Sequence, residues 1–427
     1  MSAPLLATAV RKAAWRLMPF LLLLYVLAFL DRVNLGYAKP TFLRDTGLGE
    51  GAYAFGASVF FVAYALLEVP SNLILSRVGA RVWIGATMMA WGLVSAAMTV
   101  AWTAPVFYLL RFLLGAAEAG FFPGMIWYLG SWFPARSRGG MFGIFYFGAP
   151  LAQIFGGPLS GILLEMTGWR GLRGWQWMFV TEGLLAVAAG AAATAWLTNR
   201  PAEARWLSGA ERDALESELA AEESAKGGAA GHGVGPALGQ ARVWRLGLIY
   251  GLIQMSVYGV TFYLPSQVAA LLGRNIGLVV GLVSAIPWLF ALAAAYAVPR
   301  LARWNGRRGV TAGAALAVAA VGIAVASAHL PALGLAGLCL AAGGFIGAQP
   351  IFWTFPADEL SGGSAAGGIA LINSIGAVGG FLAPNLKVLA EGWSGSARAG
   401  ALALAATTFL GAVLVGRMRE RRPGSEG

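Results

Sequence analysis

Four ionisable residues stand inside apolar stretches of the chain and are the ones best suited to chemistry. Asp31 and Arg32 are neighbours in one stretch, and Arg111 and Glu118 lie seven positions apart in another. At membrane depth each such charge costs roughly 2.5 to 3.5 kcal/mol even on lenient insertion scales, so it usually marks a functional site. Arginine stays charged when buried and presents a fork of donors that matches a carboxylate. Two arginines in one cavity therefore predict a site for an organic anion.

The spacing of these residues predicts that they border one cavity. Neighbours on a helix point about 100° apart, so Asp31 and Arg32 can line the same cavity without facing one point. A separation of seven is two turns, or about 10 Å along one face, which places Arg111 and Glu118 on the same side of their helix. In the competing interpretation the acids only neutralise the arginines structurally, although doubled pairs at mid-membrane are an expensive way to hold helices together.

Asp31 and Glu118 are also the candidates for carrying a proton. The two histidines, His232 and His329, fall in predicted loops and not in apolar stretches. An arginine beside a carboxylate favours the charged form of that carboxylate, whereas burial disfavours it. An incoming anion that occupies the arginine removes the first effect, so the anion and the proton favour each other's binding. This linkage is the thermodynamic description of symport.

The composition indicates that these residues are surrounded by a membrane. Of 427 residues, 58% are hydrophobic and only 11% are charged, which is too little charge for a soluble domain of this size. The 60 glycines suit close helix packing, and the 16 tryptophans suit interfacial anchors. The single cysteine, Cys339, excludes a disulfide framework and is expected to be a small buried hydrophobe. The sequence has no metal-ligand spacing, no phosphate-binding glycine loop and no nucleophile–base arrangement, so no enzyme and no cofactor are expected, with protons as the coupling ion.

Apolar stretches of about 20 residues predict twelve transmembrane helices. We expect an all-α membrane protein built of two pseudo-symmetric six-helix bundles. The first bundle covers residues 1–198, a polar and glycine-rich linker covers 199–242, and the second bundle with a short tail covers 243–427. The predicted spans are residues 17–38, 53–75, 83–101, 105–128, 140–164, 175–198, 243–272, 277–298, 309–328, 332–355, 363–389 and 397–416.

Weak internal repeats support the division into halves. Phe133–Ala135 precedes the fifth span, and the same three residue types recur as Phe355–Ala357, 222 positions later, at the eleventh. The pair Gly156–Gly157 returns 223 positions later as Gly379–Gly380. Two six-helix repeats joined by a central loop are the plan of a rocking transporter.

The basic residues predict the orientation. With the N-terminus in the cytoplasm, most of the 30 lysines and arginines fall in cytoplasmic segments, among them the linker and both terminal segments. Both termini and the linker are therefore expected inside. Because this topology explains the net charge of +11, no nucleic-acid partner is expected. The predicted partners of a monomeric protein are the anion, protons and the lipid bilayer.

Short motifs spread over nearly the whole chain carry a family resemblance. Arg77–Arg81, preceded by Ser76 where an aspartate is usual, and Arg111–Gly115 resemble the second-loop and fourth-helix motifs of the major facilitator superfamily. The stretches that are similar to its anion:cation symporter family, the organic-anion permeases, are Phe29–Gly36, Glu68–Asn72, Glu118–Gly124, Gly174–Trp177 and Gly368–Ser374. The resemblance implies import of an acid such as tartrate, phthalate, hydroxyphenylacetate or a sugar acid with protons, across a bacterial inner membrane.

Other polar residues in the spans are expected to shape the substrate site. Besides Arg32 and Arg111, the predicted substrate-binding residues are Tyr64, Gln153, Gln254, Tyr258, Trp353 and Asn373. Gln254 and Tyr258 are four residues apart and so share a helix face, and the resemblance aligns Tyr64, Trp353 and Asn373 with substrate-contacting positions. For each of them, an interfacial ring or an interhelical hydrogen bond is the alternative role.

Two further acids, Glu68 and Glu182, also lie in spans. Glu68 is close to the cytoplasmic end of its span, and Glu182 is about two turns in from the outer face. Capping or gate contacts are the favoured interpretation for both.

The leading hypothesis is a proton-coupled importer of a small organic acid. The first rival is a drug/proton antiporter of the same fold, because Gly156–Gly161 faintly resembles the Gly-Pro motif of such exporters. Two cavity arginines disfavour cationic drugs. The second rival, a membrane enzyme or a substrate sensor, is disfavoured because the sequence offers no catalytic constellation and no sizeable soluble domain. The sequence does not name the acid.

Overall fold

The computed structural model describes residues 3–225, 238–327, 330–359 and 363–418, and helices are the regular elements of these ranges. Within them, twelve segments are long and apolar enough to cross a membrane. The prediction of an all-α protein with twelve transmembrane helices is therefore confirmed. His232, His329 and the glycine-rich middle of the predicted linker lie outside the described residues.

The helices fall into two sets around the linker. The first set is α1 (Ala3–Thr46), α2 (Glu50–Val78), α3 (Ala80–Ala97), α4 (Ala104–Glu118), α5 (Phe121–Trp132), α6 (Ala135–Tyr146), α7 (Gly148–Glu165) and α8 (Gly174–Trp196), followed by the linker helix α9 (Gly209–Ala225). The second set is α11 (Ala241–Thr261), α12 (Leu264–Leu272), α13 (Leu278–Asn305), α14 (Arg308–Ala326), α15 (Pro331–Phe352), α16 (Thr354–Glu359), α17 (Gly363–Ser394) and α18 (Ala397–Gly416).

Four of the twelve spans are broken into two helices, whereas the sequence predicted continuous ones. The broken spans are α4–α5, α6–α7, α11–α12 and α15–α16. In each, a proline stands at the second or third residue of the second segment, at Pro123, Pro150, Pro265 and Pro356. Proline lacks the N–H that bonds to the carbonyl four residues earlier, so the helix opens in the preceding turn. Proline alone does not decide a break, because Pro287 lies inside the continuous helix α13.

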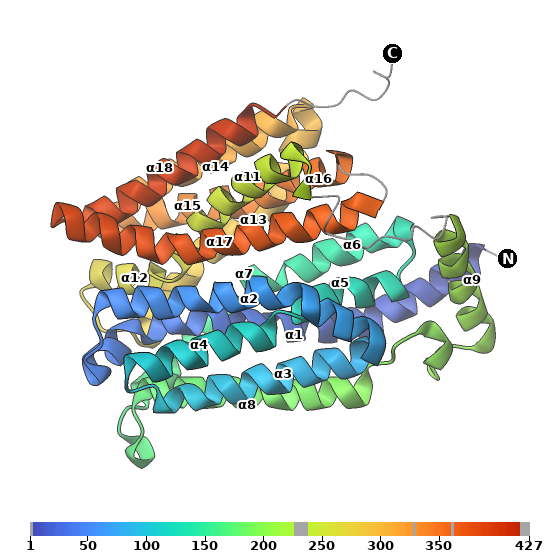
Figure 1. Ribbon diagram of the computed structural model, residues 1–427, viewed down its shortest axis with the longest axis horizontal. Coiled ribbons are helices and arrows are strands. Elements are labelled where there is room, and N and C mark those ends of the chain that lie inside the picture. The colour runs from blue at the N-terminus through green and yellow to red at the C-terminus, as the bar shows by residue number, and fades with distance from the viewer. Residues whose placement is uncertain (1–2, 226–237, 328–329, 360–362, 419–427) are drawn as a thin grey trace.

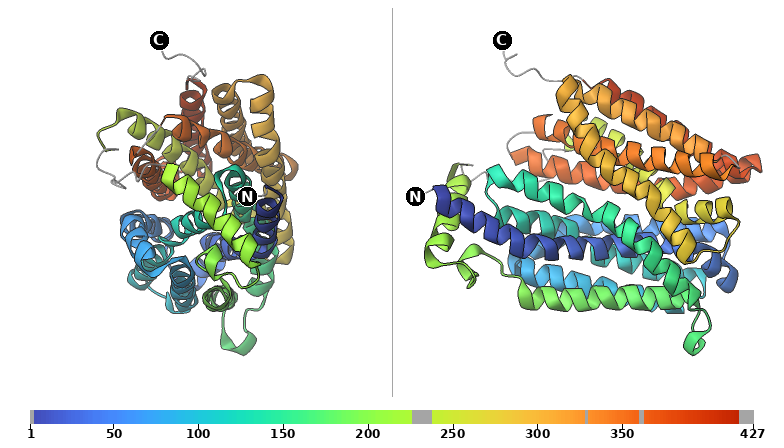
Figure 2. Two further views of the ribbon diagram at one scale, coloured as in Figure 1. Left: turned by 90° about the vertical axis from the view of Figure 1, so that its right-hand side faces the viewer. Right: turned by 180° about the vertical axis from the view of Figure 1, so that it is seen from behind.

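The two sets of helices lie side by side along the long axis of the molecule. Figure 1 shows α1–α8 below and α11–α18 above, with the N-terminus and α9 at the right-hand end and α12 at the left-hand end. We call these ends the linker side and the far side. Figure 2 shows the same arrangement from the end and from behind. The boundaries at 198 and 242 stay a prediction, because residues 226–237 within the linker are not described.

The linker helix α9 is fastened to the first set of helices. Lys12 Nζ lies 2.6 Å from Glu211 Oε1, and the hydrogen bond from this ammonium lowers the pKa of the Glu211 carboxyl. At the other end of α9, Glu222 accepts hydrogen bonds from Arg138 Nη2 at 3.0 Å and from the Ala135 backbone N–H at 2.7 Å. Because α1 and α6 supply these donors, α9 stays with the first half of the protein.

On the far side the two halves touch directly. A Cβ on Gly281 of α13 would lie 2.2 Å from the Gly157 carbonyl oxygen of α7, so the two backbones meet with no room for a side chain. Nearby, the ring of Tyr263 lies between two ammonium groups, 4.6 Å from Lys39 Nζ and 4.2 Å from Lys387 Nζ. Since Lys39 belongs to α1 and Lys387 to α17, this ring joins the halves.

We predict that Gly281→Val opens the far side. The added side chain cannot fit against the Gly157 backbone, so the variant disfavours the conformation in which α7 and α13 touch. Ser58, which is fully buried and accepts a hydrogen bond from Asn385 at 2.8 Å, provides a reporter position on α2. In a Cys339→Ala background, Ser58→Cys is expected to react about tenfold faster with a membrane-impermeant maleimide from the far side, which corresponds to a shift of about 1.4 kcal/mol.

The matched control is Gly130→Val, because a Cβ on Gly130 meets open space. This control should label as slowly as the parent. Equal labelling of all three proteins would show that the α7–α13 contact does not hold the far side shut.

Candidate functional site

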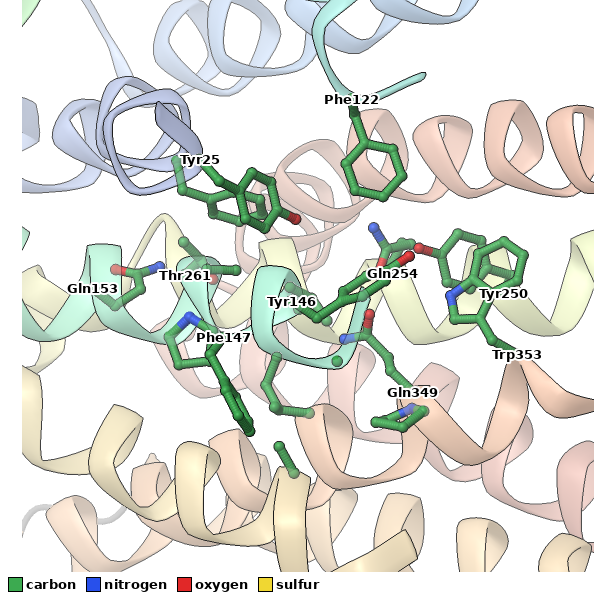
Figure 3. A pocket seen from close by; sticks show the side chains of 18 of the residues that line it. Tyr25, Phe122, Tyr146, Phe147, Gln153, Tyr250, Gln254, Thr261, Gln349 and Trp353 are labelled. Carbon is green, nitrogen blue, oxygen red and sulfur yellow. The ribbon is translucent and has the colours of Figure 1, made fainter. Parts of the chain in front are cut away.

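A cavity of about 640 Å³ lies between the two halves. Helices α1, α2, α5, α6 and α7 line one wall, and α11, α13, α15 and α17 line the other. The lining extends to Gly139 near the start of α6 and to Arg303 near the end of α13, both close to the linker side. The cavity therefore opens toward the linker side and ends below the far-side contact. Figure 3 shows it with Gln153 and Thr261 on one side and Tyr250 and Trp353 on the other.

Seven of the eight predicted substrate-binding residues line this cavity. They are Arg32, Tyr64, Gln153, Gln254, Tyr258, Trp353 and Asn373. They come from α1, α2 and α7 in the first half and from α11, α17 and the turn between α15 and α16 in the second. The structure thus brings together residues that are more than 300 positions apart in the sequence.

Arg32 is the charged residue deep in the cavity wall. Its Nε donates to Glu118 Oε2 at 2.7 Å, and its Nη1 donates to the Tyr258 hydroxyl at 3.5 Å. The guanidinium carbon lies 4.9 Å from the centre of the Tyr64 ring and 5.3 Å from that of Phe29. The arginine side chain keeps 13% of its surface exposed, whereas that of Glu118 keeps 1%. A guanidinium framed by rings and partly open to a cavity is suited to meet an anion.

The two predicted proton carriers lie one layer behind the cavity. Glu118 is the last residue of α4 and reaches Arg32 from the buried side. Asp31 is 1% exposed, and its Oδ1 accepts hydrogen bonds from Ser95 Oγ at 2.6 Å and from Asn34 Nδ2 at 3.3 Å. In the competing interpretation of the sequence each arginine is neutralised by the acid of its own helix, but Arg32 instead pairs with Glu118 across α1 and α4. Neither carboxylate is among the lining residues.

Arg111 differs from the expectation that both arginines border the cavity. It is 1% exposed and does not contribute to the lining. Its Nε and Nη2 donate to the backbone carbonyls of Gly56 and Ala57 at 3.3 and 3.5 Å. The helix face that carries Arg111 packs against α2, so this guanidinium faces the α2 backbone and the Phe60 ring, 5.0 Å away. One cavity arginine remains of the predicted two.

The wall from the second half offers neutral polar atoms without partners. Gln254 Oε1, Thr261 Oγ1 and Trp288 Nε1 are buried, line the cavity and have no hydrogen-bond partner within the described part of the chain. Buried polar atoms in folded proteins are nearly always paired, so unpaired ones at a cavity indicate groups that meet water or a ligand. Opposite Arg32 the second half therefore supplies neutral donors, acceptors and rings, and its two lining arginines, Arg300 and Arg303, are exposed near the end of α13.

Asn373 lines the cavity and also ties the halves together. Its Nδ2 donates to Glu68 Oε1 at 2.9 Å, and Ser374 Oγ donates to Glu68 Oε2 at 3.3 Å. Glu68, on α2, is 3% exposed. The sequence interpretation of Glu68 is either capping or gate contacts. The structure shows Glu68 in a contact between α2 and α17, which is nearer to the second of these two roles.

Several lining residues were missed by sequence reasoning, and two of them had a signal. Tyr25 lies seven positions before Arg32, so it shares the cavity face of α1. Thr261 lies three positions after Tyr258 and continues the same face of α11. Trp288 had no comparable signal, because its span is apolar all round and its side chain is placed by packing alone.

Comparison with known proteins assigns the family. A model of the Major Facilitator Superfamily matches residues 21–384. The chain belongs to this superfamily. It is 50% identical to the inner membrane transport protein RhmT of Escherichia coli (strain K12) over 422 residues, which cover 99% of this chain and 98% of that protein. A putative tartrate transporter of Agrobacterium vitis is 42% identical over 97% of this chain and 95% of its own length.

A further relative is named for a different role. A quinolone resistance transporter of Acinetobacter baumannii is 37% identical over 95% of this chain and 93% of its own length. Among solved structures, the inward open conformation of the xylose transporter XylE from E. coli matches with a TM-score of 0.75 at 14% identity, over 96% of this chain and 97% of that one. The structural likeness shows the major facilitator fold. The protein is thus a multi-pass membrane transporter of small solutes and not an enzyme.

We predict that Arg32 and Glu118 are energetically coupled and that Arg32 and Asp31 are not. A double-mutant cycle of Arg32→Gln and Glu118→Gln should give a coupling of about 1.5–3 kcal/mol, the usual size for a hydrogen bond to a charged group. The cycle of Arg32→Gln and Asp31→Asn serves as the control and should give less than about 0.5 kcal/mol. Unfolding in mixed detergent–SDS micelles measures both. Equal couplings would contradict the pairing across α1 and α4.

Proposed function

We propose that this protein imports a small organic anion together with protons, by alternating access of the cavity between its two halves. The observation that carries the proposal is Arg32, whose guanidinium lies in the cavity wall with Glu118 behind it. A carboxylate substrate is matched to the arginine fork. The family and the relative named as a putative tartrate transporter support the same class of substrate.

The proposed orientation places the linker side in the cytoplasm. The linker helix α9 and the arginine-rich end of α13 lie on that side, in accord with the rule that basic segments stay inside. The cavity in this conformation then faces the cytoplasm, and the far-side contact closes the outer entrance. The relative named as an inner membrane transport protein supports the same membrane. A monomer suffices, because the site is complete within one chain.

The coupling follows from competition for one guanidinium. In the absence of substrate, Glu118 occupies Arg32 Nε. A substrate carboxylate that takes the arginine leaves Glu118 buried without its cationic partner, and a buried carboxylate in that position is stable only as the neutral acid. Anion binding and proton binding therefore favour each other. Asp31, buried on α1 directly before Arg32, is the second candidate for the proton.

An exporter of the same fold is the alternative. The relative named as a quinolone resistance transporter favours it, and the aromatic lining, with Tyr25, Phe122, Tyr146 and Tyr250, would accept a ring-bearing solute. Export by proton exchange would drive the solute in the opposite direction from symport.

Reconstituted vesicles separate the two functions. We expect an inward proton gradient to drive accumulation of a radiolabelled acid from a panel that includes tartrate, and a protonophore to abolish it. Arg32→Lys keeps the charge but loses the fork, so its uptake should fall ten- to a hundredfold, which corresponds to about 1.5–3 kcal/mol. Arg398→Lys, an exposed arginine of α18 that does not line the cavity, is the matched control and should transport normally. Proton-driven loss of solute from preloaded vesicles would instead support the exporter.

Neutral variants of the two carboxylates separate binding from coupling. Asp31→Asn and Glu118→Gln resemble the protonated acids, so substrate should still bind, and exchange of labelled for unlabelled substrate should continue. Accumulation driven by the proton gradient should fall to the level of empty vesicles, because the variant group cannot take up and release a proton. Wild-type accumulation in either variant would remove that carboxylate from the coupling, and loss of exchange as well as uptake would assign it a structural role.

A further inference from the structure

A second group of buried polar side chains lies behind the Arg32–Glu118 pair. Asp31 and Asn34 of α1 and Glu182 of α8 are 1%, 0% and 1% exposed. Within the described ranges, neither Asp31 nor Glu182 forms an ion pair with a lysine or arginine. Two carboxylates at this depth, with no cation in contact, need another source of compensation.

In each carboxylate, one oxygen accepts hydrogen bonds and the other has no hydrogen-bond partner among the described residues. Asp31 Oδ1 accepts from Ser95 Oγ at 2.6 Å and from Asn34 Nδ2 at 3.3 Å. Glu182 Oε1 accepts from Ser160 Oγ at 2.8 Å. Asp31 Oδ2 and Glu182 Oε2 have no hydrogen-bond partner in the described part of the protein. The serine hydroxyls of α3 and α7 therefore donate to only one of the two oxygens of each carboxylate.

Asn34 lies between the two acids, and its own side-chain oxygen lacks a hydrogen-bond partner among the described residues. Its side-chain nitrogen contacts Asp31, its amide also interacts with Glu182, and its Oδ1 has no partner among the described residues. The three oxygens without partners are all acceptors when the acids are ionised. Two buried donors stand near them, Trp91 Nε1 at Asp31 and the Tyr37 hydroxyl at Glu182, but neither forms a hydrogen bond within the described part of the chain. A single bound proton supplies one O–H donor and removes one of the two buried charges.

We propose that Asp31 and Glu182, with Asn34 between them, form a second proton-binding site beside Glu118. The inference rests on the proposed symport and adds Glu182 to it. A proton from water forms one O–H bond to a carboxylate oxygen of the pair and changes the charge of the pair from −2 to −1. Release on the other side of the membrane breaks that bond and returns the proton to water. The pair stores the proton without a histidine.

The surroundings of the pair connect it to the far-side contact. Tyr37 of α1 acts on Glu182 and lies beside Ser284 of α13, and a Cβ on Gly157 would come within 2.6 Å of its hydroxyl. The polar groups that face Glu182 thus come from α1, in Asp31, Asn34 and Tyr37, and from α7, in Ser160. When α7 and α13 separate, this end of the cluster meets the far-side water, so the proton enters there.

The groups that act on Asp31 come from α3 and α4. Ser95 and Trp91 face it from α3, and Glu118 and Arg111 act on it from α4. In the proposed mechanism Glu118 loses its contact with Arg32 when an anion binds. Because Glu118 acts on Asp31, anion binding then changes how readily the pair of acids takes up a proton. This places the second proton in the same linkage as the first.

Infrared spectroscopy of the protein in vesicles tests the site without a substrate. A neutral carboxylic acid has a carbonyl band apart from those of carboxylates, and the band shifts in D2O. We expect the wild type to show this band at neutral pH, to lose it reversibly on titration within about pH 5–10, and to lose one group's share of its intensity in Glu182→Gln. Asp213→Asn, on exposed α9, is the control and should leave the band unchanged.

The far-side entry is tested with the same band. In Gly281→Val, which opens the α7–α13 contact, hydrogen–deuterium exchange of the band should be at least about tenfold faster from the far side. An unchanged exchange rate would overturn entry at this contact.

Three results would overturn the proton site. A spectrum of Glu182→Gln that equals the wild type would show that Glu182 carries no proton. A band that stays constant over the whole pH range would show a fixed structural acid. A band that is removed by sodium and not by pH would assign the oxygens to a metal cation. None of these results depends on transport, so failure of the organic-acid uptake assay and failure of this site can be told apart.

Discussion

The ion pair between Arg32 and Glu118 is the interaction on which the rest of the site depends. Glu118 is almost fully buried and stands at the last residue of α4, where the negative end of the helix dipole disfavours a carboxylate. It can remain ionised there because Arg32 Nε lies 2.7 Å away. Arg32 in turn keeps a small exposed surface toward the cavity. One guanidinium therefore serves a fixed internal anion and a visiting one, and the two compete.

Among the described residues, the buried charges are confined to the first half of the protein, and this asymmetry has a physical reason. Buried charges must keep their partners while the halves move. Arg32, Glu118, Asp31 and Glu182 all belong to α1–α8, so their mutual contacts are internal to one rigid group of helices. The second half approaches them with rings and with neutral atoms such as Gln254 Oε1, which has no partner among the described residues. Hydrogen bonds to neutral groups cost less to break and remake than hydrogen bonds to charged ones. Rocking then changes access to the charges without separating them.

The sequence was sufficient for the fold but only partly for the site. Apolar stretches define twelve spans because a bilayer imposes its length on each helix. The spacing of Arg111 and Glu118 identified the helix face that they share, but one face of a helix can pack against two neighbouring helices. Arg111 meets α2 and Glu118 meets α1, a difference set by the crossing of α4 with both. Pairings between helices, such as Asn373 with Glu68, depend on packing that no spacing reports.

The two seams between the halves differ in a way that determines how the cavity can close. Along α2 and α17, hydrogen bonds join the halves at two depths, from Asn385 to Ser58 at 2.8 Å and from Asn373 to Glu68 at 2.9 Å. Along α7 and α13 the halves touch at Gly157 and Gly281, but nearer the linker side α6 and the end of α13 line the open cavity. Closure of the linker side must therefore bring α6 toward α13. The break between α6 and α7 falls at Phe147, three residues before Pro150, and allows α6 to bend without moving the glycine contact.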